Sequence, residues 1–523
     1  MKKYFLLIAL FAFYNTLNAQ NLNLIPYPQQ VKQLKTTLRI KPESMFFTKN
    51  SQYKNEVLYL NGQLGLAGKG RQEIRIVITK DIEGIGAYRL STVSNKIAIM
   101  AAEREGVFNG VTTLLQLCRS AKAEDSRILP GLIINDKPRY QWRGFMLDES
   151  RHFFGMAAVK NILNWMAFYK LNRFHWHLTD AQGWRIEIKK YPWLTKIGGI
   201  GNFTDSTAAA RYYTQKEIKE IVAYAKRRHI EIVPEIDMPG HATAANKAYP
   251  KYSGGKVKGY DDFTFNPGKE ETYQFLTNIL KELKVLFPDG RIHIGGDEVA
   301  LGIKAWDNNT DVKKLMEKKG YTDHQQAEAY FLRRIADSVI KLKNKVMCWD
   351  EAVAANLPVN HVLVNWWRQN KPEVLQEAIT KGYPIILSPR LPMYFDFVQD
   401  STHISGRKWD GHYNTYLDVY HFPENDLTAD VYQSKNVIGV QANLWTETVA
   451  SQKRLDYLLF PRIAAVAESG WTFDATKNDD LFNARLKAHL NYYKNAGIYY
   501  FDPFNPSFHK EAVDVAPKPV IKD

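Results

Sequence analysis

Two adjacent carboxylates, Asp297 and Glu298, follow a short apolar strand and two glycines in the segment Arg291-Ile-His-Ile-Gly-Gly-Asp-Glu298. Adjacent residues on extended backbone point in different directions, so this pair cannot flank a bond symmetrically. The two can act in series, with one protonating a leaving group while the other holds the substrate. Gly295 and Gly296 are expected to leave room for a ligand against the backbone. The alternative is a helix start with acidic residues in its first turn.

Four tryptophans lie near the ends of separate predicted strands or in the loops beyond them: Trp349, Trp367, Trp409 and Trp445. The C–H faces of sugar rings stack on indole, so aromatic walls with carboxylates between them are typical of a carbohydrate pocket. Core packing is the alternative for any single tryptophan. The pairing of tryptophan with acid in Trp349-Asp350-Glu351 and Trp445-Thr446-Glu447 favours a site.

Three histidines could suggest a metal, but their spacing does not. His175 and His177 share one face of a strand that reads as core, and with His241 they complete no zinc-ligand spacing. We therefore expect no catalytic metal and no cofactor.

Eight short apolar segments, most of them followed by an amphipathic helix, must position these residues. The predicted strands are Gly144–Asp148, Arg173–Thr179, Glu231–Asp237, Arg291–Asp297, Val346–Asp350, Val362–Trp367, Pro384–Ser388 and Val437–Trp445. The predicted helices include Met156–Lys170, Gln215–Arg228, Glu271–Phe287, Gln325–Leu342 and Glu373–Thr380. This alternation predicts an α/β fold, a (β/α)8 TIM barrel, although the link from Asp350 to Val362 is too short for a full helix. A doubly wound open sheet is the alternative, but no glycine-rich phosphate loop follows the first strand.

Polar and aromatic residues gather at or just past the C-terminal ends of these strands: Asp148, Asp180, Asp237, Asp297, Asp350 and Trp367. That edge of a barrel carries the catalytic residues. A single Asp could cap the next helix. Five at successive strand ends favour one shared site.

Residues 20–138 predict a small α+β accessory domain that contains no tryptophan. Segments Ala87–Val93 and Lys96–Ala102 flank Ser94-Asn95 as a hairpin, and apolar residues from Val107 to Cys118 fall at helical spacing. We expect residues 139–523 to form the catalytic barrel with a short C-terminal extension.

The first 19 residues resemble an export signal. A basic start is followed by an apolar run from Phe5 to Tyr14 and a cleavage site after Ala19. A bilayer span needs roughly 20 apolar residues, so this run is too short, and a retained anchor is the weaker alternative. We expect export to the periplasm or the medium, with no membrane span after cleavage.

The composition is that of a globular protein, with 45% hydrophobic and 24% charged residues, which excludes disordered, collagen-like and coiled-coil chains. The net charge of +15 is scattered along the sequence rather than concentrated in a stripe, so we expect no nucleic-acid partner. Cys118 and Cys348 are too few for a disulfide framework and are expected to be buried free thiols. The sequence leaves the oligomeric state open.

Taken together, the motifs resemble the β-N-acetylhexosaminidases of glycoside hydrolase family 20. The matching segments are Arg143-Gly-Phe-Met-Leu-Asp-Glu-Ser-Arg-His-Phe153, Lys170-Leu-Asn-Arg-Phe-His-Trp-His-Leu-Thr-Asp180, Gln182-Gly-Trp-Arg185, Glu235-Ile-Asp-Met-Pro-Gly-His241, His293-Ile-Gly-Gly-Asp-Glu298 and Trp349-Asp-Glu351. Ile25-Pro-Tyr-Pro28 and Thr113-Leu-Leu-Gln-Leu117 resemble the family's N-terminal non-catalytic domain.

The resemblance implies a retaining mechanism without a protein nucleophile, in which the substrate's own 2-acetamido oxygen attacks the anomeric carbon and forms an oxazolinium ion. By this similarity Glu298 is the general acid and then the general base, and a neighbouring carboxylate is expected to raise its pKa. Asp297 would orient the acetamido group and stabilise its developing charge. Tyr394 would hydrogen-bond the acetamido oxygen.

The resemblance also implies the substrate-binding residues. Arg151 would grip the outer hydroxyls, Asp180 and His241 would support the acid, and Trp349, Trp367 and Trp445 would wall the acetamido methyl and the ring face. Asp396 and Glu447 would be further hydroxyl ligands, and Trp409 would face a second sugar. Trp366 should face away from the site. Ala181 stands where many relatives have a second Asp, which matters little if Asp180 is the partner of His241.

The implied activity is exo-hydrolysis of terminal β-linked N-acetylglucosamine, with N-acetylgalactosamine as a second sugar, from glycans or chitooligosaccharides. The alternatives are a relative that releases a disaccharide or acts on a 6-sulfated sugar, and a non-catalytic glycan-binding protein.

Overall fold

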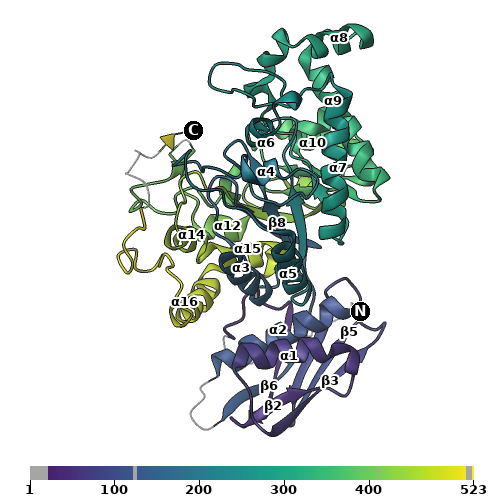
Figure 1. The fold of residues 1–523 in the computed structure, drawn as a ribbon. Helices are drawn as coiled ribbons and strands as arrows, with labels where there is room; N and C mark the ends of the chain where they lie inside the picture. Colours follow the sequence, from purple (N-terminus) through teal and green to yellow (C-terminus); the bar gives the residue numbers. More distant parts are fainter. Residues whose placement is uncertain (1–21, 122–125, 410, 514–520, 523) are drawn as a thin grey trace, which may run out of the picture.

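The computed structural model describes residues 22–121, 126–409, 411–513 and 521–522. The predicted export signal lies outside the described residues. Figure 1 shows a smaller N-terminal domain, in purple and blue, beside a larger body that carries the rest of the chain.

The N-terminal domain is a six-stranded sheet with helices packed on it (Figure 1). The strands run in the order β1 (Gln30–Ile40), β6 (Arg127–Asp136), β4 (Tyr88–Val93), β5 (Lys96–Ala101), β3 (Gly70–Ile78) and β2 (Ser44–Phe47). The helices are α1 (Lys54–Leu64) and α2 (Arg104–Ser120). The predicted hairpin is β4–β5, where Ser94 and Asn95 take positive φ angles of 51° and 60°, as a tight two-residue turn requires. The predicted helix is α2, and its Cys118 is a buried free thiol.

The larger body is a closed barrel of eight parallel strands, which confirms the predicted fold class. The strands are β7 (Trp142–Asp148), β8 (Arg173–His177), β11 (Glu231–Glu235), β12 (Arg291–His293), β13 (Lys345–Trp349), β14 (Val362–Trp366), β15 (Ile385–Leu387) and β17 (Val437–Leu444). They follow one another around the barrel in chain order, and β17 closes it against β7. Each predicted strand overlaps one of these. Every residue of β7 is buried, as is usual for a strand of a parallel sheet that is covered on both faces.

Helices surround the barrel (Figure 1). They are α3 (Met156–Phe168), α4 (Trp193–Lys196), α5 (Gln215–Lys226), α6 (Thr243–Ala248), α7 (Glu270–Leu286), α8 (Thr310–Lys319), α9 (His324–Lys341), α10 (Pro372–Lys381), α11 (Arg390–Met393), α12 (Tyr416–His421), α13 (Ala429–Tyr432), α14 (Gln452–Leu459), α15 (Arg462–Trp471) and α16 (Asp479–Asn495). The five predicted helices match α3, α5, α7, α9 and α10. Local signals fix their ends: Thr214 and Glu217 form a capping box at the start of α5.

The connections between strands vary in a way that shapes the site. Only 3₁₀ turns, Asp350–Ala355 and Val359–His361, join β13 to β14, as the short spacing predicted. Small two-stranded pairs lie outside the barrel: β9 (Thr179–Asp180) with β10 (Gly183–Trp184), and β16 (Arg407–Lys408) with β18 (Ile521–Lys522). The long segment between β15 and β17 carries α11, β16, α12 and α13. It supplies Tyr394 and Trp409.

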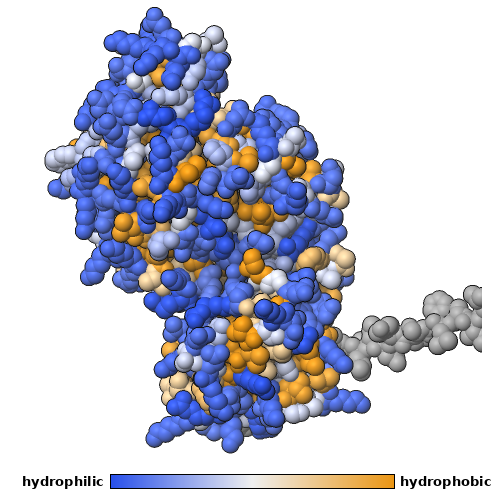
Figure 2. Space-filling model, turned by 90° about the vertical axis from the view of Figure 1, so that its right-hand side faces the viewer, coloured by the Kyte–Doolittle hydropathy of each residue, from blue (hydrophilic) through white to orange (hydrophobic). Residues whose placement is uncertain are grey.

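The surface of the described residues in Figure 2 is mainly hydrophilic, with hydrophobic residues grouped on the face of the N-terminal domain that this view shows. Among the described helices, none is both long and apolar enough to cross a bilayer. Cys348, in β13, is the second buried free thiol.

Candidate active site

A cavity of about 460 Å³ opens at the C-terminal ends of the barrel strands. Its lining residues come from the ends of β12, β13 and β14 and from the loops that follow β7, β11, β15 and β17. They are Arg151, His241, Asp297, Glu298, Trp349, Trp367, Arg390, Tyr394, Phe397, Arg407, Trp409, Trp445 and Glu447. Several elements thus contribute to one site, as in other barrels of this type.

The acidic pair lies just past β12, which ends at His293, four residues earlier than the predicted strand. Gly295 (φ 69°) and Gly296 (φ 94°) turn the chain, and Glu298 itself has φ 50°. The expectation that the glycines make room for a ligand is wrong for Gly295: a Cβ there would lie 1.7 Å from Oδ1 of Asp237. The space is taken by a carboxylate of the protein.

One histidine faces both carboxylates. Nε2 of His241 lies 3.4 Å from Oε2 of Glu298 and 3.7 Å from Oδ2 of Asp297. Its Nδ1 lies 2.9 Å from Oδ1 of Asp180. Asp180 is therefore the partner of His241, so Ala181 removes nothing from this pair. The Asp297 side chain is 11% exposed and that of Glu298 is 42% exposed, so the two adjacent side chains do reach different surroundings.

The pKa directions differ from the sequence-based expectation. Burial alone would raise the pKa of Glu298, but the hydrogen bond and charge of His241 outweigh burial and lower it. His241 carries that charge because Asp180 and Asp237 outweigh its own burial and raise its pKa. Burial and the nearby Asp237 raise the pKa of Asp297 well above its usual range. The carboxyl with the raised pKa is thus that of Asp297 rather than that of Glu298.

Arg151 crosses the back of the cavity between several carboxylates. Its Nη2 lies 2.8 Å from Oδ2 of Asp180 and 4.0 Å from Oε1 of Glu447, and its Nη1 lies 3.4 Å from Oδ2 of Asp148. The guanidinium also stacks on Trp445, with Cζ 4.9 Å from the ring centroid. These contacts hold the Arg151 guanidinium, which can donate two hydrogen bonds to one ligand, beside a cavity of the size of a sugar.

The aromatic wall is held by hydrogen bonds from its indole groups. Trp349 donates Nε1–H to Oε1 of Glu235 at 2.8 Å, and Trp367 donates to Oε2 of Glu351 at 2.9 Å. Tyr394 stacks on Trp367 with ring centroids 6.4 Å apart. Burial raises the pKa of the Tyr394 phenol well above its ordinary value, so it remains a hydrogen-bond donor.

All predicted site residues except Asp180 and Asp396 line the cavity. Asp180 is buried directly behind Arg151 and His241, and Asp396 is buried with its Oδ2 3.6 Å from Nε of Arg407. Trp366 is buried in the main core, as expected. Asp350 is outside the cavity: Arg368 binds it, with Nε 3.2 Å from its Oδ2, so the idea of one site for all five strand-end acids is wrong there.

The sequence reasoning missed Arg390, Phe397 and Arg407. Arg390 and Phe397 lie in the short segment that also carries Tyr394, which is the signal that could have found them. Arg407 is in β16, and its Nη2 lies 3.2 Å from Oε1 of Glu447. No pattern near it pointed to the site.

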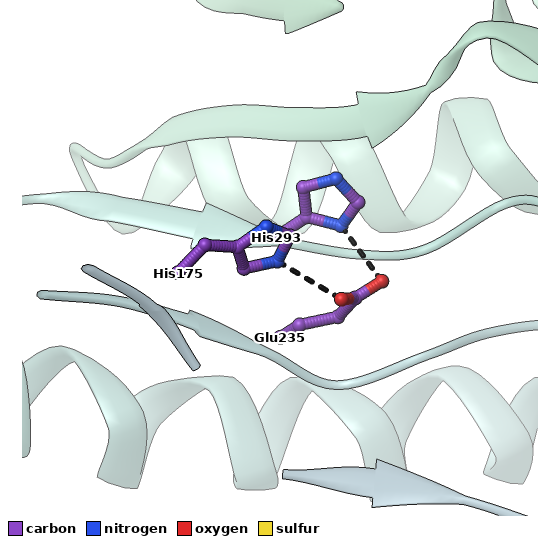
Figure 3. A group of neighbouring side chains, drawn as sticks. All are labelled: His175, Glu235 and His293. Atoms are coloured by element: carbon purple, nitrogen blue, oxygen red, sulfur yellow. Dashed lines mark ion pairs between the residues drawn. The ribbon is translucent and has the colours of Figure 1, made fainter. Parts of the chain in front are cut away.

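Three groups of acidic and histidine side chains among the described residues have ligand atoms close enough to hold a metal. Figure 3 shows the deepest, His175, Glu235 and His293. Gln441 accepts from the Trp142 indole at 3.2 Å, which directs its amide nitrogen to Nδ1 of His175 at 3.0 Å. His175 then keeps its proton on Nε2, which faces Glu235 at 2.9 Å. A ligating nitrogen carries no proton, so hydrogen bonding accounts for this group better than a metal does.

The other two groups share Asp237: one adds His177 and Asp180, the other His241 and Asp297. Both nitrogens of His177 already face carboxylates. Nδ1 of His241 likewise faces Asp180. Ion pairs therefore occupy the histidine nitrogens that a metal would need.

Comparisons with known proteins agree with this geometry. The family model described as glycosyl hydrolase family 20, catalytic domain, matches residues 140–474, and that described as domain 2 of the same family matches residues 21–137. A beta-hexosaminidase of Vibrio furnissii is 33% identical over 482 residues, which are 87% of this chain and 77% of that protein.

Solved structures show the same architecture. A family 20 exo-β-N-acetylglucosaminidase from Vibrio harveyi, in complex with N-acetylglucosamine, has a TM-score of 0.83 at 29% identity, covering 92% of this chain and 79% of that one. The N-acetyl-β-hexosaminidase of Streptomyces plicatus, in complex with Thio-NAglucal, has a TM-score of 0.79 at 30% identity, with coverage of 93% and 97%.

Proposed function

The chain belongs to glycosyl hydrolase family 20, and from that premise we propose that its cavity removes a terminal β-linked N-acetylglucosamine residue with Glu298 as the acid and base. The enzyme is an exo-acting β-N-acetylhexosaminidase that works by substrate-assisted catalysis. The roles of individual residues below are part of the proposal.

Binding places the sugar against the aromatic wall. Arg151 donates hydrogen bonds to the outer hydroxyls and Glu447 accepts hydrogen bonds from them, and Asp396 binds a further hydroxyl. Trp445 supports the ring face, while Trp349 and Trp367 enclose the acetamido methyl. The contacts that hold Arg151 and the indoles in place support these roles, because groups that are already ordered lose little entropy on binding.

The first chemical step forms the oxazolinium ion. The acetamido oxygen attacks the anomeric carbon as the glycosidic oxygen leaves with a proton from Glu298. The positive charge that develops on the acetamido group lowers the pKa of Asp297, so its ionised carboxylate accepts a hydrogen bond from the acetamido N–H and stabilises that charge. Tyr394 donates a hydrogen bond from its hydroxyl to the acetamido oxygen. Because the nucleophile is tethered to the substrate, its effective concentration is high.

Glu298 must be protonated for this step, although His241 lowers its pKa in the free site. The Glu298 side chain is 42% exposed, so a bound sugar removes water from it. Desolvation raises the pKa of a carboxyl, which favours the acid form in the complex. In the second step Glu298 takes a proton from water, whose oxygen attacks the anomeric carbon as the bond to the acetamido oxygen breaks and the acetamido group is restored. Two successive inversions at that carbon give retention of configuration.

One observation carries the proposal: two adjacent carboxylates face the same histidine at 3.4 and 3.7 Å, inside a cavity walled by fixed indoles. A glycan-binding protein without activity needs the indoles. It has no use for a carboxyl whose protonation is controlled by an Asp180–His241 pair.

Replacing the acid tests the assignment. Glu298→Gln should lower kcat by about 10²- to 10⁴-fold on N-acetyl-β-glucosaminides with poor leaving groups, and less on an activated aryl glycoside. The matched control is Glu328→Gln, which removes a carboxyl from the neighbouring cavity of about 350 Å³ and should leave kcat within a few-fold of wild type. A Glu298→Gln enzyme with near-normal turnover on the poor leaving groups would remove Glu298 from this role.

The substrate is tested by comparing sugars that share one leaving group. The N-acetyl-β-glucosaminide should be hydrolysed and the plain β-glucoside should not, because it has no acetamido oxygen. N-acetylgalactosaminide, 6-sulfo-N-acetylglucosaminide and a disaccharide glycoside complete the panel. Equal rates on the glucoside and the N-acetylglucosaminide would contradict the assisted mechanism.

Export is a separate part of the proposal and rests on residues 1–19 alone. A basic start, a ten-residue apolar run and a small residue before the cleavage site support it. N-terminal sequencing of the protein from a cell envelope fraction should begin at Gln20.

A further inference from the structure

Glu235 is the point at which four side chains from three strands meet. It ends β11 and is fully buried. His177 faces its Oε2 with Nδ1 at 2.6 Å, and Trp349 donates to its Oε1 at 2.8 Å. His175 and His293 lie 2.9 and 3.0 Å from its two oxygens, as Figure 3 shows. A carboxylate with this many partners cannot turn without breaking several contacts at once.

One arm of this cluster leads to the proposed acid. His177 binds Glu235 through Nδ1 and Oδ2 of Asp180 through Nε2, the latter at 2.9 Å. Asp180 binds His241 at 2.9 Å, and His241 reaches Glu298 at 3.4 Å. Carboxylate and imidazole alternate along the whole chain: the first three links are charge-assisted hydrogen bonds, and the last, from His241 to Glu298, is a longer ion pair at 3.4 Å.

His177 carries a proton on both nitrogens because both face carboxylates. Its burial would lower the pKa, but Glu235 and Asp180 outweigh burial and raise the pKa well above its ordinary value. Without the Glu235 charge, the Nδ1–H of His177 would lose its acceptor. The His177 ring would then be held less firmly, and Asp180 would lose one of the two partners, His177 and Arg151, that hold its Oδ2.

The other arm leads to the acetamido wall. The Trp349 indole has Glu235 as its hydrogen-bond acceptor, and its ring packs beside that of Trp445, with centroids 5.9 Å apart. Rotation of Trp349 would widen the space proposed for the acetamido methyl. Glu235 therefore does not line the cavity, but its contacts hold Trp349, which does, and His177, which supports Asp180 behind it.

We infer that Glu235 is a positioning residue. It fixes the position of the Asp180–His241 pair, which supports Glu298, relative to that of the Trp349 wall. The inference rests on the proposed function, since it gives Glu298 and Trp349 their roles. A displacement of about 1 Å at a reacting group can cost about 10²-fold in rate, so a buried residue without substrate contact can have a large effect.

Glu235→Gln keeps the shape and removes the charge, and two readouts separate positioning from folding. First, kcat should fall by about 10²-fold on poor leaving groups and much less on activated ones, because proton donation is impaired. Second, the preference in kcat/KM for N-acetyl over the larger N-propionyl substrate should shrink, because Trp349 is released. A loss of folded enzyme alone would lower all rates equally.

His175→Gln is the matched control. It removes another partner of Glu235 from the same buried cluster, and although the His175 ring packs beside Trp349, with centroids 5.8 Å apart, His175 makes no hydrogen bond to Trp349, His177 or Asp180. It should lower the thermal stability. The dependence of kcat on the leaving group and the preference for N-acetyl over N-propionyl substrate should both stay as in the wild type. If His175→Gln changes the leaving-group dependence and the N-acyl preference as much as Glu235→Gln does, any disturbance of the cluster has this effect, Glu235 has no positioning role of its own, and the inference is wrong.

Single-arm variants keep the inference testable if Glu235→Gln does not fold. His177→Gln should change the leaving-group dependence alone, and Trp349→Phe, which keeps a ring but removes the indole N–H, should change the N-acyl preference alone. Wild-type ratios in both variants would overturn the inference. Failure of the proposed function is distinct, because it would appear as a wild-type enzyme without N-acetyl-dependent activity.

Discussion

At the scale of residues, each indole around the cavity is held by a charged group. Glu235 accepts from Trp349, Glu351 accepts from Trp367, and Arg151 lies over Trp445. A large ring held by one directional contact has few alternative rotamers. The sugar therefore meets a wall that is already in place, and binding costs less ordering entropy.

Arg390 makes a different contact, because both faces of its guanidinium lie on aromatic rings. Its Cζ is 4.4 Å from the centroid of Trp367 and 4.4 Å from that of Trp409. Trp367 belongs to the proposed acetamido wall and Trp409 to the proposed site of a second sugar. Arg390 is thus the structural link between the two sugar positions.

Removing this link should affect longer substrates more than short ones. A cation–π contact contributes about 0.5–2 kcal/mol, so we expect Arg390→Ala to lower kcat/KM on a chitooligosaccharide by about 3- to 30-fold more than on an aryl monosaccharide. The measurement is kcat/KM on both substrates. Lys408→Ala, which removes a nearby cation outside the cavity lining, is the control. An equal loss on both substrates would contradict this role.

The sequence was informative about residue types and less so about their protonation. Spacing and motif placed Asp297, Glu298 and His241 in one site, because strand ends in a barrel converge. The sequence could not give the direction in which the pKa values of these groups shift. That direction depends on distances such as the 3.4 Å from His241 to Glu298. Arg407 was missed for a similar reason: its strand follows a long segment without periodic pattern.

At the scale of elements, the end of β12 shows why the acid stands where it does. The strand stops at His293, and the next residues take positive φ at Gly295, Gly296 and Glu298. Left-handed backbone at a non-glycine residue is unfavourable and occurs mainly where surrounding contacts enforce it. The sequence indicated two adjacent carboxylates after a strand and two glycines, but not this turn, in which the Asp237 carboxylate lies close beside Gly295.

Helix α16 is fixed to the rest of the chain by a neutral histidine. His489 is fully buried; its Nδ1 lies 3.0 Å from the hydroxyl of Tyr169 and its Nε2 3.0 Å from the carbonyl of Asn23. The carbonyl needs the proton of Nε2, so Nδ1 accepts from the hydroxyl. Burial lowers the pKa of His489 to about 3.

This histidine makes stability depend on pH with a definite sign. Between about pH 6.5 and its lowered pKa, the unfolded chain binds one more proton than the folded one, so the free energy of unfolding falls as pH falls, by about 1.4 kcal/mol per pH unit. In His489→Gln that contribution is absent, so its deficit against wild type should shrink from near pH 7 to near pH 5. Urea unfolding at both values measures it, with the exposed His361→Gln as control. A deficit that stays constant would show that His489 is not buried neutral.

At the scale of the whole molecule, the N-terminal domain is attached to the barrel by buried polar contacts. Arg143 of β7 binds Glu105 of α2 at 2.9 Å, and Gln116 of α2 donates to the backbone carbonyl of Phe168 at 2.8 Å. Such contacts are specific in direction, so they fix how the two domains are oriented. Among the described residues, the domain contributes none to the cavity lining.

The strongest of these contacts is a buried ion pair. Nζ of Lys170, from the barrel, lies 3.3 Å from Oδ2 of Asp136 and 3.0 Å from the hydroxyl of Tyr88, both in the N-terminal domain. It also lies 4.4 Å from the ring centroid of Trp471, whose indole donates to Asp136 at 3.0 Å. Burial lowers the pKa of Lys170 to about 8, so the ammonium depends on Asp136 to stay charged.

Removing only one charge of this pair should therefore lower the free energy of unfolding strongly, whereas removing both charges should lower it much less. We expect Asp136→Asn to lower the free energy of unfolding by about 3–5 kcal/mol, because it leaves the Lys170 ammonium buried without a counter-charge. The double variant Asp136→Asn with Lys170→Met should recover most of that loss, since neither charge then needs solvation. Calorimetric unfolding measures both, and kcat/KM at a temperature where all variants are folded should stay near wild type. A single variant as stable as wild type would mean that the domains are held by their apolar contacts alone.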